Sequence, residues 1–133
     1  MMIKALDHIV LEVADVQRSI DFYAGLGMEP ERFDEYRRGE VKFPSLRISA
    51  DTLIDVFPPQ MHDRPKGDGH NLHHFALVTD LPISEIRAAL KRLSIAIEQE
   101  ADHNFGARGL ANSVYVRDPD GNRVEIRTYA AAS

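Results

Sequence analysis

The sequence predicts an α+β fold built from two β-α-β-β-β modules, and three patterns lead to this prediction. Apolar and polar residues alternate in several short runs, which is typical of strands with one buried face. Two runs with helical spacing each follow the first strand of one half of the chain. The two halves also repeat one another. We therefore expect a curved, cup-like mixed sheet with the helices on its outside.

The first half is expected to open with a strand whose polar face carries His8, opposite Ile9 and Leu11. Asp15 is a typical N-cap residue, because a short carboxylate can accept hydrogen bonds from the first turn of a helix. The elements expected in this half are a strand over 3–13, a helix from Asp15 to Gly25 or Gly27, a strand or extended loop over 29–38, and strands over 41–49 and 53–57.

The second half follows a stretch rich in Pro, Gly and charge, residues 58–70, which we interpret as a linker. It separates module 1–57 from module 71–129 within a single domain, 1–133. The elements expected after it are a strand over 72–79, a helix over 82–93, a short strand over 94–98, a polar connection over 99–109 and a hairpin over 113–127.

The hairpin is the clearest local feature of the chain. Its two strands alternate apolar and polar residues, and the turn between them contains Pro119 and Gly121, which suit a tight reversal. This alternation predicts that Glu125 lies on the polar face of a stiff strand, where a carboxylate can serve as a ligand or a base.

The internal repeat brings particular side chains into correspondence. Aligning His8 with His74 also aligns the apolar residues of both first strands and places a helix after each. At the far end of each half, Asp55 corresponds to Glu125. Each module therefore offers one imidazole from its first strand and one carboxylate from its last.

Composition excludes several classes of function. The chain has 133 residues and a formal charge of -5, so it lacks the basic surface that binding to nucleic acid or an anionic membrane requires. It has no cysteine, so a metal ion would have to be bound by imidazole and oxygen. No apolar stretch has the length of a membrane span, and we expect a cytoplasmic protein.

These side chains predict a metal site. His8, His74 and Glu125 form the expected ligand set. Whether Asp55 is a fourth ligand is left open, because its side chain is shorter than that of its repeat partner, Glu125. Two imidazoles with carboxylates suit a divalent ion such as Zn, Ni, Mn, Co or Fe. Each of these residues alone could equally be a hydrogen-bonded strand residue, and either carboxylate could pair with Arg47, Arg123 or Arg127 instead. The repeat favours the metal interpretation.

Further polar residues are candidates for substrate contact. Ser113 and Arg127 share the expected face of Glu125, and Arg47 is a further candidate for binding the substrate. Tyr115 is the candidate acid or hydrogen-bond donor, and Glu125 the candidate base. The remaining histidines are not expected to bind the metal. His73 is expected to pack under the helix or cap the linker, and surface loops are expected for His62, His70 and His103.

With these residues in place, the sequence resembles the vicinal oxygen chelate superfamily, which includes glyoxalase I, extradiol dioxygenases, fosfomycin transferases and bleomycin-binding proteins. The resemblance rests on LDHIVLEVADVQRSIDFY, HHFALVTD and SVYVRDPDGNRVEIR, and so covers nearly the whole chain. It implies that His8, His74 and Glu125 bind a metal, and that Asp55 stands where glyoxalase I has a glutamate ligand. It also implies a small-molecule substrate and a homodimer.

Two features depart from glyoxalase I. Asp55 is shorter than the glutamate of that enzyme, and Glu12 stands where bacterial glyoxalase I has an arginine that helps bind glutathione. The resemblance therefore implies a metal-dependent, glyoxalase-like lyase or isomerase that chelates two neighbouring substrate oxygens and moves a proton. A fosfomycin-type thiol transferase and an Fe(II) extradiol dioxygenase are the enzymatic alternatives. A bleomycin-type sequestering protein without a metal is the third.

Overall fold

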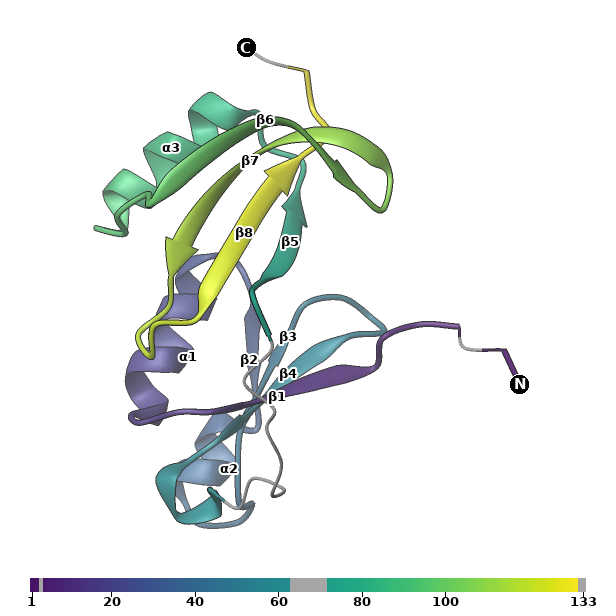
Figure 1. The fold of residues 1–133 in the computed structure, drawn as a ribbon. Helices are drawn as coiled ribbons and strands as arrows, with labels where there is room; N and C mark the ends of the chain where they lie inside the picture. Colours follow the sequence, from purple (N-terminus) through teal and green to yellow (C-terminus); the bar gives the residue numbers. More distant parts are fainter. Residues whose placement is uncertain (3, 63–71, 132–133) are drawn as a thin grey trace. The chain divides into compact units, whose positions relative to one another are not determined.

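The computed structural model describes residues 1–2, 4–62 and 72–131. The chain divides into two compact units, Met1–Lys66 and Gly67–Ser133. Each unit has one four-stranded mixed sheet, coloured purple to teal in the first unit and teal to yellow in the second (Figure 1).

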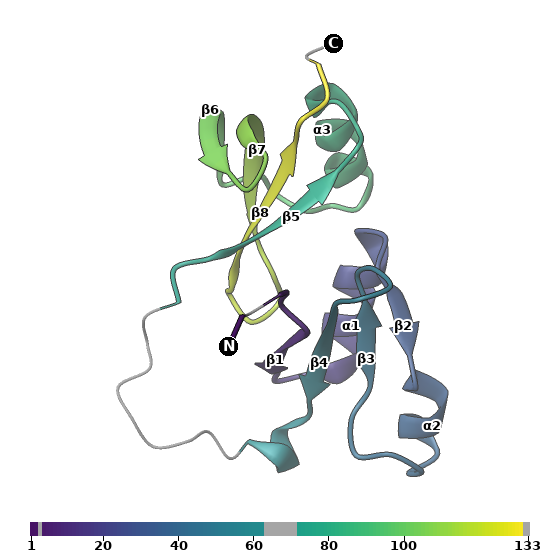
Figure 2. The same ribbon diagram turned by 90° about the vertical axis from the view of Figure 1, so that its right-hand side faces the viewer.

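The first unit has a sheet in the order β1-β4-β3-β2, which Figure 2 shows strand by strand. Its first and last strands, β1 and β4, run parallel, and the other neighbours are antiparallel. The elements are β1 (His8–Glu12), α1 (Val16–Gly25), β2 (Glu29–Glu31), α2 (Phe33–Arg37), β3 (Ser45–Arg47), β4 (Leu53–Phe57) and a 3-10 helix (Pro59–Met61).

The core of this unit lies between α1 and the sheet. Asp15 caps the helix as predicted, with its carboxylate accepting a hydrogen bond from the backbone of Arg18 at 3.1 Å. Ile20 and Tyr23 of α1 are buried, Ile54 and Val56 of β4 are fully buried, and α1 is in contact with β4. Because strand side chains alternate between faces, Asp55 lies on the side of β4 opposite this core.

The second unit repeats this arrangement with the order β5-β8-β7-β6. Here β5 and β8 are the parallel pair, and α3 lies along the sheet with Ile86 and Leu90 buried (Figures 1 and 2). The elements are β5 (Phe75–Thr79), α3 (Ile83–Arg92), β6 (Gln99–Gly106), β7 (Gly109–Arg117) and β8 (Arg123–Thr128). The predicted fold class, with two β-α-β-β-β modules, is confirmed.

The register of the parallel strands matches between the units. Val10 pairs with Asp55 in the first unit, and Ala76 pairs with Glu125 in the second. The histidine in each unit is therefore two residues before the partner of the carboxylate. The repeat that the sequence predicts is thus a repeat of hydrogen-bonding register as well as of residue type.

The prediction of a strand or extended loop over 29–38 was only partly right. A short strand is followed by the helix α2, whose N-cap residue, Arg32, lies in the left-handed region (φ 60°) and forms no side-chain cap. Because arginine is not one of the residue types that cap a helix N-terminus, the sequence gives no signal for the start of α2. Its supports are local, namely a stacked ring pair 6.5 Å apart between Phe33 and Tyr36 and an ion pair of 3.6 Å between Asp34 and Arg37.

The predictions over 94–98 and 99–109 were wrong. Residues 94–98 form no strand, and β6 instead begins at Gln99 and runs where a polar connection was expected. Its pairing with β7 is irregular between Ala101 and Asn104, where His103 adopts a φ of 55°. This irregularity breaks the two-residue period by which a strand is recognised. His103 therefore lies in a strand rather than in a loop.

Other boundaries are shorter than predicted. The strand expected over 3–13 spans His8–Glu12, and the strand expected over 41–49 spans Ser45–Arg47. Of the expected linker 58–70, residues 63–70 lie outside the described residues, and with them His70. None of the helices within the described ranges has the length and hydropathy needed to span a membrane.

The turn between β7 and β8 depends on one buried carboxylate. Asp118, 5% exposed, accepts hydrogen bonds from the backbone of Asp120 at 2.9 Å and from the backbone and side chain of Asn122 at 2.8 and 2.9 Å. We predict that Asp118→Ala lowers the free energy of unfolding by about 2–4 kcal/mol, because three donors of the turn lose one buried, charged acceptor. Denaturant unfolding measures this. Asp102→Ala, at an exposed acid of the same unit, is the control, and an equal loss in both variants would contradict the prediction.

Candidate functional site

The first unit brings His8 and Asp55 together, as the sequence predicts. Nε2 of His8 lies 3.8 Å from Oδ2 of Asp55. The other oxygen of this carboxylate accepts a hydrogen bond of 2.7 Å from the hydroxyl of Ser45, the cross-strand neighbour of Asp55. Arg32 donates in turn to Ser45 at 3.4 Å. Asp55 thus keeps one oxygen directed at the imidazole.

The opposite side of the His8 ring contacts an acid. Nδ1 of His8 lies 2.7 Å from Oδ1 of Asp7. This hydrogen bond, with a smaller contribution from the charge of Asp55, raises the pKa of His8 above its usual value. The ring therefore lies between two carboxylates, one at each nitrogen.

The second unit brings His74 and Glu125 together at the corresponding positions. Nε2 of His74 lies 3.1 Å from Oε1 of Glu125. Oε2 accepts hydrogen bonds from Arg127 at 2.8 Å and from the side-chain amide of Asn104 at 3.1 Å. Asn104 was missed at the sequence level because it lies on β6, where no strand was expected. Its contact with Glu125 gives it a part in the site.

Glu125 is almost completely buried, with 3% of its surface exposed. Burial alone would raise the pKa of this carboxyl, but hydrogen bonds from Arg127, Tyr115 and Asn104 outweigh it and hold the pKa below its usual value. Glu125 is therefore ionised at neutral pH. An ionised carboxylate with one oxygen facing an imidazole is suited to metal binding.

Arg127 is buried as well, and its guanidinium faces the strand β6. Besides Glu125, it donates to the carbonyl oxygens of Phe105 at 3.3 Å, Asn104 at 3.0 Å and Gly109 at 3.2 Å. A Cβ at Gly106 would meet this guanidinium, so the residue is glycine because the backbone must pass close to it. These contacts give Arg127 a structural role in fixing β6 and Glu125. Its contact with a substrate stays a prediction.

The other predicted contact residues are also engaged within their units. Ser113 is fully buried and donates to Asn104 at 3.3 Å. The ring of Tyr115 meets the ring of His74 edge-on at 5.5 Å, with Arg123 4.0 Å above its face. Arg47 forms two hydrogen bonds to Glu31, of 2.9 and 3.1 Å. Of these residues, Tyr115 is the one that touches the His74–Glu125 pair.

Of the two roles predicted for His73, packing under the helix is wrong, and capping of the linker stays a prediction. His73 is exposed rather than packed under the helix, and its Nδ1 lies 2.7 Å from Nδ1 of His74. His62 is exposed as predicted and hydrogen-bonds the carbonyl oxygens of Val13 and Phe57 at 3.1 and 3.3 Å. His73 is thus the one with a direct contact to a candidate ligand.

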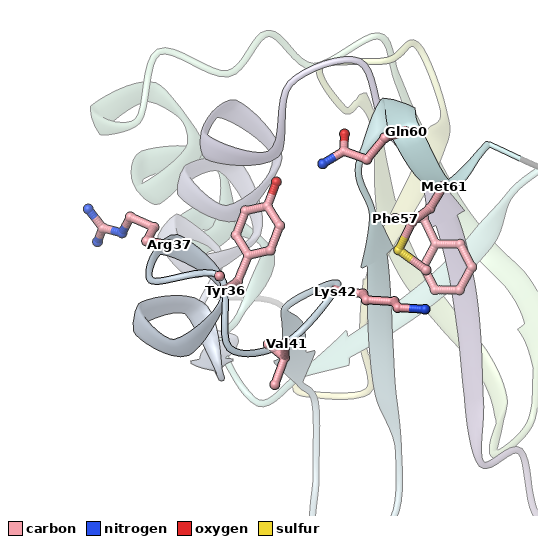
Figure 3. A pocket seen from close by; sticks show the side chains of 8 residues that line it. Tyr36, Arg37, Val41, Lys42, Phe57, Gln60 and Met61 are labelled. Carbon is pink, nitrogen blue, oxygen red and sulfur yellow. The ribbon is translucent and has the colours of Figure 1, made fainter.

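A pocket of about 920 Å³ lies in the first unit (Figure 3). Its lining combines rings and a thioether with two cationic side chains. The residues are Tyr36, Arg37, Gly39, Val41, Lys42, Phe57, Gln60 and Met61. Phe57 lies two residues beyond Asp55 on β4, so the two side chains share one face of the strand.

Across residues 1–2, 4–62 and 72–131, no group of three or more His, Asp or Glu side chains that could bind a metal is found. The structure instead gives one histidine–carboxylate pair in each unit. Two β-α-β-β-β units, each with such a pair, place the chain in the class of βαβββ-repeat proteins. A family profile described as the Glyoxalase/Bleomycin resistance protein/Dioxygenase superfamily matches residues 5–126, and the chain belongs to this superfamily.

Relatives cover the chain almost end to end. The virulence protein STM3117 of Salmonella typhimurium is 32% identical over 130 residues, which cover 97% of this chain and 87% of that protein. Its crystal structure has a TM-score of 0.78 at 30% identity, over 98% of this chain and 100% of the other. A lactoylglutathione lyase from Agrobacterium tumefaciens has a TM-score of 0.67 at 22% identity, over 96% of each chain, and shares the fold.

We predict that Gly106→Ala lowers the free energy of unfolding by about 1–3 kcal/mol, because the new methyl group overlaps the buried guanidinium of Arg127. A double-mutant cycle with Arg127→Ala tests the cause. Most of the cost of Gly106→Ala should vanish when the guanidinium is absent. An equal cost in both backgrounds would show that the overlap is not responsible.

The lowered pKa of Glu125 predicts a pH dependence of stability. A carboxyl whose pKa is lower in the folded state stabilises the protein above its unfolded pKa, about 4.3, and loses this contribution as the pH falls through the folded value. Glu125→Gln should therefore flatten the loss of stability below about pH 4.3, in urea unfolding at a series of pH values. Glu98→Gln, at a more exposed carboxylate, should flatten it less. Identical slopes for wild type and Glu125→Gln would refute this.

Proposed function

We propose that the protein is a metal-dependent enzyme of glyoxalase type, acting on a small substrate with two neighbouring oxygens. The observation that carries this proposal is the repeated pair: His8 with Asp55 and His74 with Glu125 stand at equivalent register positions in the two units. We propose that His8, His74 and Glu125 bind one divalent ion, with Asp55 as the fourth protein ligand. The superfamily to which the chain belongs supports this assignment.

The geometry of each pair fits a metal. Two ligand atoms about 2.1 Å from one ion and at right angles to each other are about 3.0 Å apart. Nε2 of His74 and Oε1 of Glu125 are 3.1 Å apart. The 3.8 Å between His8 and Asp55 corresponds to a wider angle at the ion. Imidazole and carboxylate together suit Zn, Ni, Mn, Co or Fe.

A bound divalent ion would draw electron density from the substrate oxygens. The protein's own groups then divide the remaining tasks. Glu125 is held ionised by Arg127 and Asn104, which suits a ligand and allows it to accept a proton. Tyr115 packs against His74 and hydrogen-bonds Glu125, so its hydroxyl is the proposed proton donor to the substrate.

We propose that the pocket of the first unit, which Phe57 lines, holds the non-reacting part of the substrate. Its aromatic rings favour an apolar group, and Lys42 favours a negative charge on the same molecule. The guanidinium of Arg37 points away from the pocket and contacts Phe33 and Asp34 (Figure 3). Since Phe57 shares the face of Asp55, a substrate that fills the pocket would extend towards the candidate ligands. Superfamily members often form dimers, and we propose a homodimer here as well.

A sequestering protein without a metal is the second candidate. The ion pair of 2.8 Å between Arg127 and Glu125 favours it, because the guanidinium already neutralises the carboxylate. Against it, Oε1 of Glu125 still faces an imidazole, and the first unit has its own pair. Metal content decides between the two candidates.

We predict that the purified protein retains about one divalent ion per chain after dialysis. His8→Ala, His74→Ala and Glu125→Gln should each retain little, because each removes or weakens a ligand. Elemental analysis measures this. His103→Asn removes an exposed histidine at a positive φ that asparagine tolerates, and should retain wild-type metal content. Equal trace metal in all five proteins would remove the basis of the enzyme proposal.

Activity then separates the reaction classes within the enzyme proposal. Conversion of the hemithioacetal of methylglyoxal supports the glyoxalase reaction, and thiol addition to fosfomycin supports the transferase. Reconstitution with Fe(II) in the absence of oxygen, followed by oxygen uptake on catechols, tests the dioxygenase. If the metal-loaded protein does not convert the hemithioacetal but is active in one of the other two assays, that reaction replaces the glyoxalase assignment.

A further inference from the structure

We propose that Asp7 and His73 are positioning residues for the metal ligands. Each hydrogen-bonds Nδ1 of the histidine that follows it and thereby leaves Nε2 of that ring for the metal. This inference rests on the proposed metal site. It adds a repeated outer pair of side chains that sets the tautomer and the orientation of both imidazoles.

In the first unit the tautomer follows from the chemistry of Asp7. Its carboxylate, an acceptor, lies 2.7 Å from Nδ1 of His8, so the proton of the neutral ring is on Nδ1. Nε2 then carries a lone pair and faces Oδ2 of Asp55 at 3.8 Å. A divalent ion placed between this lone pair and Oδ2 of Asp55 would have both atoms as ligands.

In the second unit His73 has the same relation to His74. Their Nδ1 atoms are 2.7 Å apart, so one of them donates to the other. Nε2 of His74 is within hydrogen-bonding distance of Oε1 of Glu125, at 3.1 Å, and donates its proton to this carboxylate when no metal lies between them. When Nε2 binds a metal, the proton of His74 must be on Nδ1, and His73 must accept it through its own Nδ1 lone pair.

The repeat makes these two residues equivalent. Asp7 directly precedes His8, and His73 directly precedes His74, at matching positions of the two parallel strand pairs. The backbone of Asp7 is fixed as well, because its carbonyl oxygen accepts a hydrogen bond of 3.2 Å from Leu53 of β4. Both side chains are exposed, so core packing does not explain their contacts.

The chemistry of the two partners differs. A carboxylate increases the basicity of the imidazole it contacts more than a neutral ring does, because the hydrogen bond is charge-assisted. Loss of the Asp7 side chain should therefore weaken metal binding more than loss of the His73 side chain. Groups of this kind typically contribute about 10- to 100-fold to metal affinity.

The test measures the Kd for Co(II), by competition with a chromophoric chelator, in pairs of variants. Asp7→Ala and His73→Ala remove the acceptor, and we expect about 10- to 100-fold weaker binding, with the larger effect for Asp7. Asp7→Asn and His73→Asn keep an acceptor oxygen near the same place and should stay within a few-fold of wild type. Asp51→Ala, which removes an exposed acid, and His103→Asn are matched controls and should bind as wild type does.

Histidine ring ¹⁵N NMR of the Zn(II)-loaded protein gives a second readout that a structural role would not move. We expect His8 to carry the proton on Nδ1 in both the Zn(II)-loaded and the metal-free wild type, and metal-free Asp7→Ala to show mixed tautomers at His8. If the wild type binds Co(II) but the alanine variants bind equally well, the positioning roles are refuted and the metal site stands. If the wild type binds no metal, the proposed function fails and the positioning roles fail with it.

Discussion

The parallel pairing of the first and last strands within each unit is the constraint on which the candidate site depends. In both units this pairing holds the same register, so that a histidine stands two residues before the partner of a carboxylate. Side-chain alternation then directs the carboxylates of Asp55 and Glu125 away from the helix-facing side of their strands. A shift of one residue in either pairing would reverse that direction. The chemistry of the pair thus follows from backbone hydrogen bonding.

The two units use this arrangement differently. Asp55 is anchored by the hydroxyl of Ser45 and faces a half-exposed imidazole. Glu125 is buried and anchored by the charge of Arg127, which also binds the backbone of β6. The second carboxylate is consequently the more firmly held one, because Glu125 accepts hydrogen bonds from a charged donor, Arg127, and from Asn104, whereas Asp55 accepts one from Ser45. This asymmetry agrees with Glu125 as a principal ligand and Asp55 as an additional one.

The sequence predicts those parts of the fold whose signals are local and periodic. The hairpin from Ser113 to Arg127, the Asp15 cap and both long helices all follow from spacing and capping. The repeat alone predicts that His8 pairs with Asp55 and His74 with Glu125. It does not predict β6, because an irregular pairing interrupts the alternation there, nor α2, which has no capping residue. Asn104 was missed for the first of these reasons. The contact of His73 with His74 was missed because strand alternation does not describe a residue that precedes its strand.

The central claim is that imidazoles from both units bind the same divalent ion. Pulsed electron paramagnetic resonance of the protein loaded with one equivalent of Cu(II) tests it most directly, because nitrogen couplings count the bound imidazoles. The account predicts couplings from the imidazoles of both His8 and His74 in the wild type, and from a single imidazole in either His8→Ala or His74→Ala. A spectrum without imidazole coupling, or one that neither substitution changes, would contradict it.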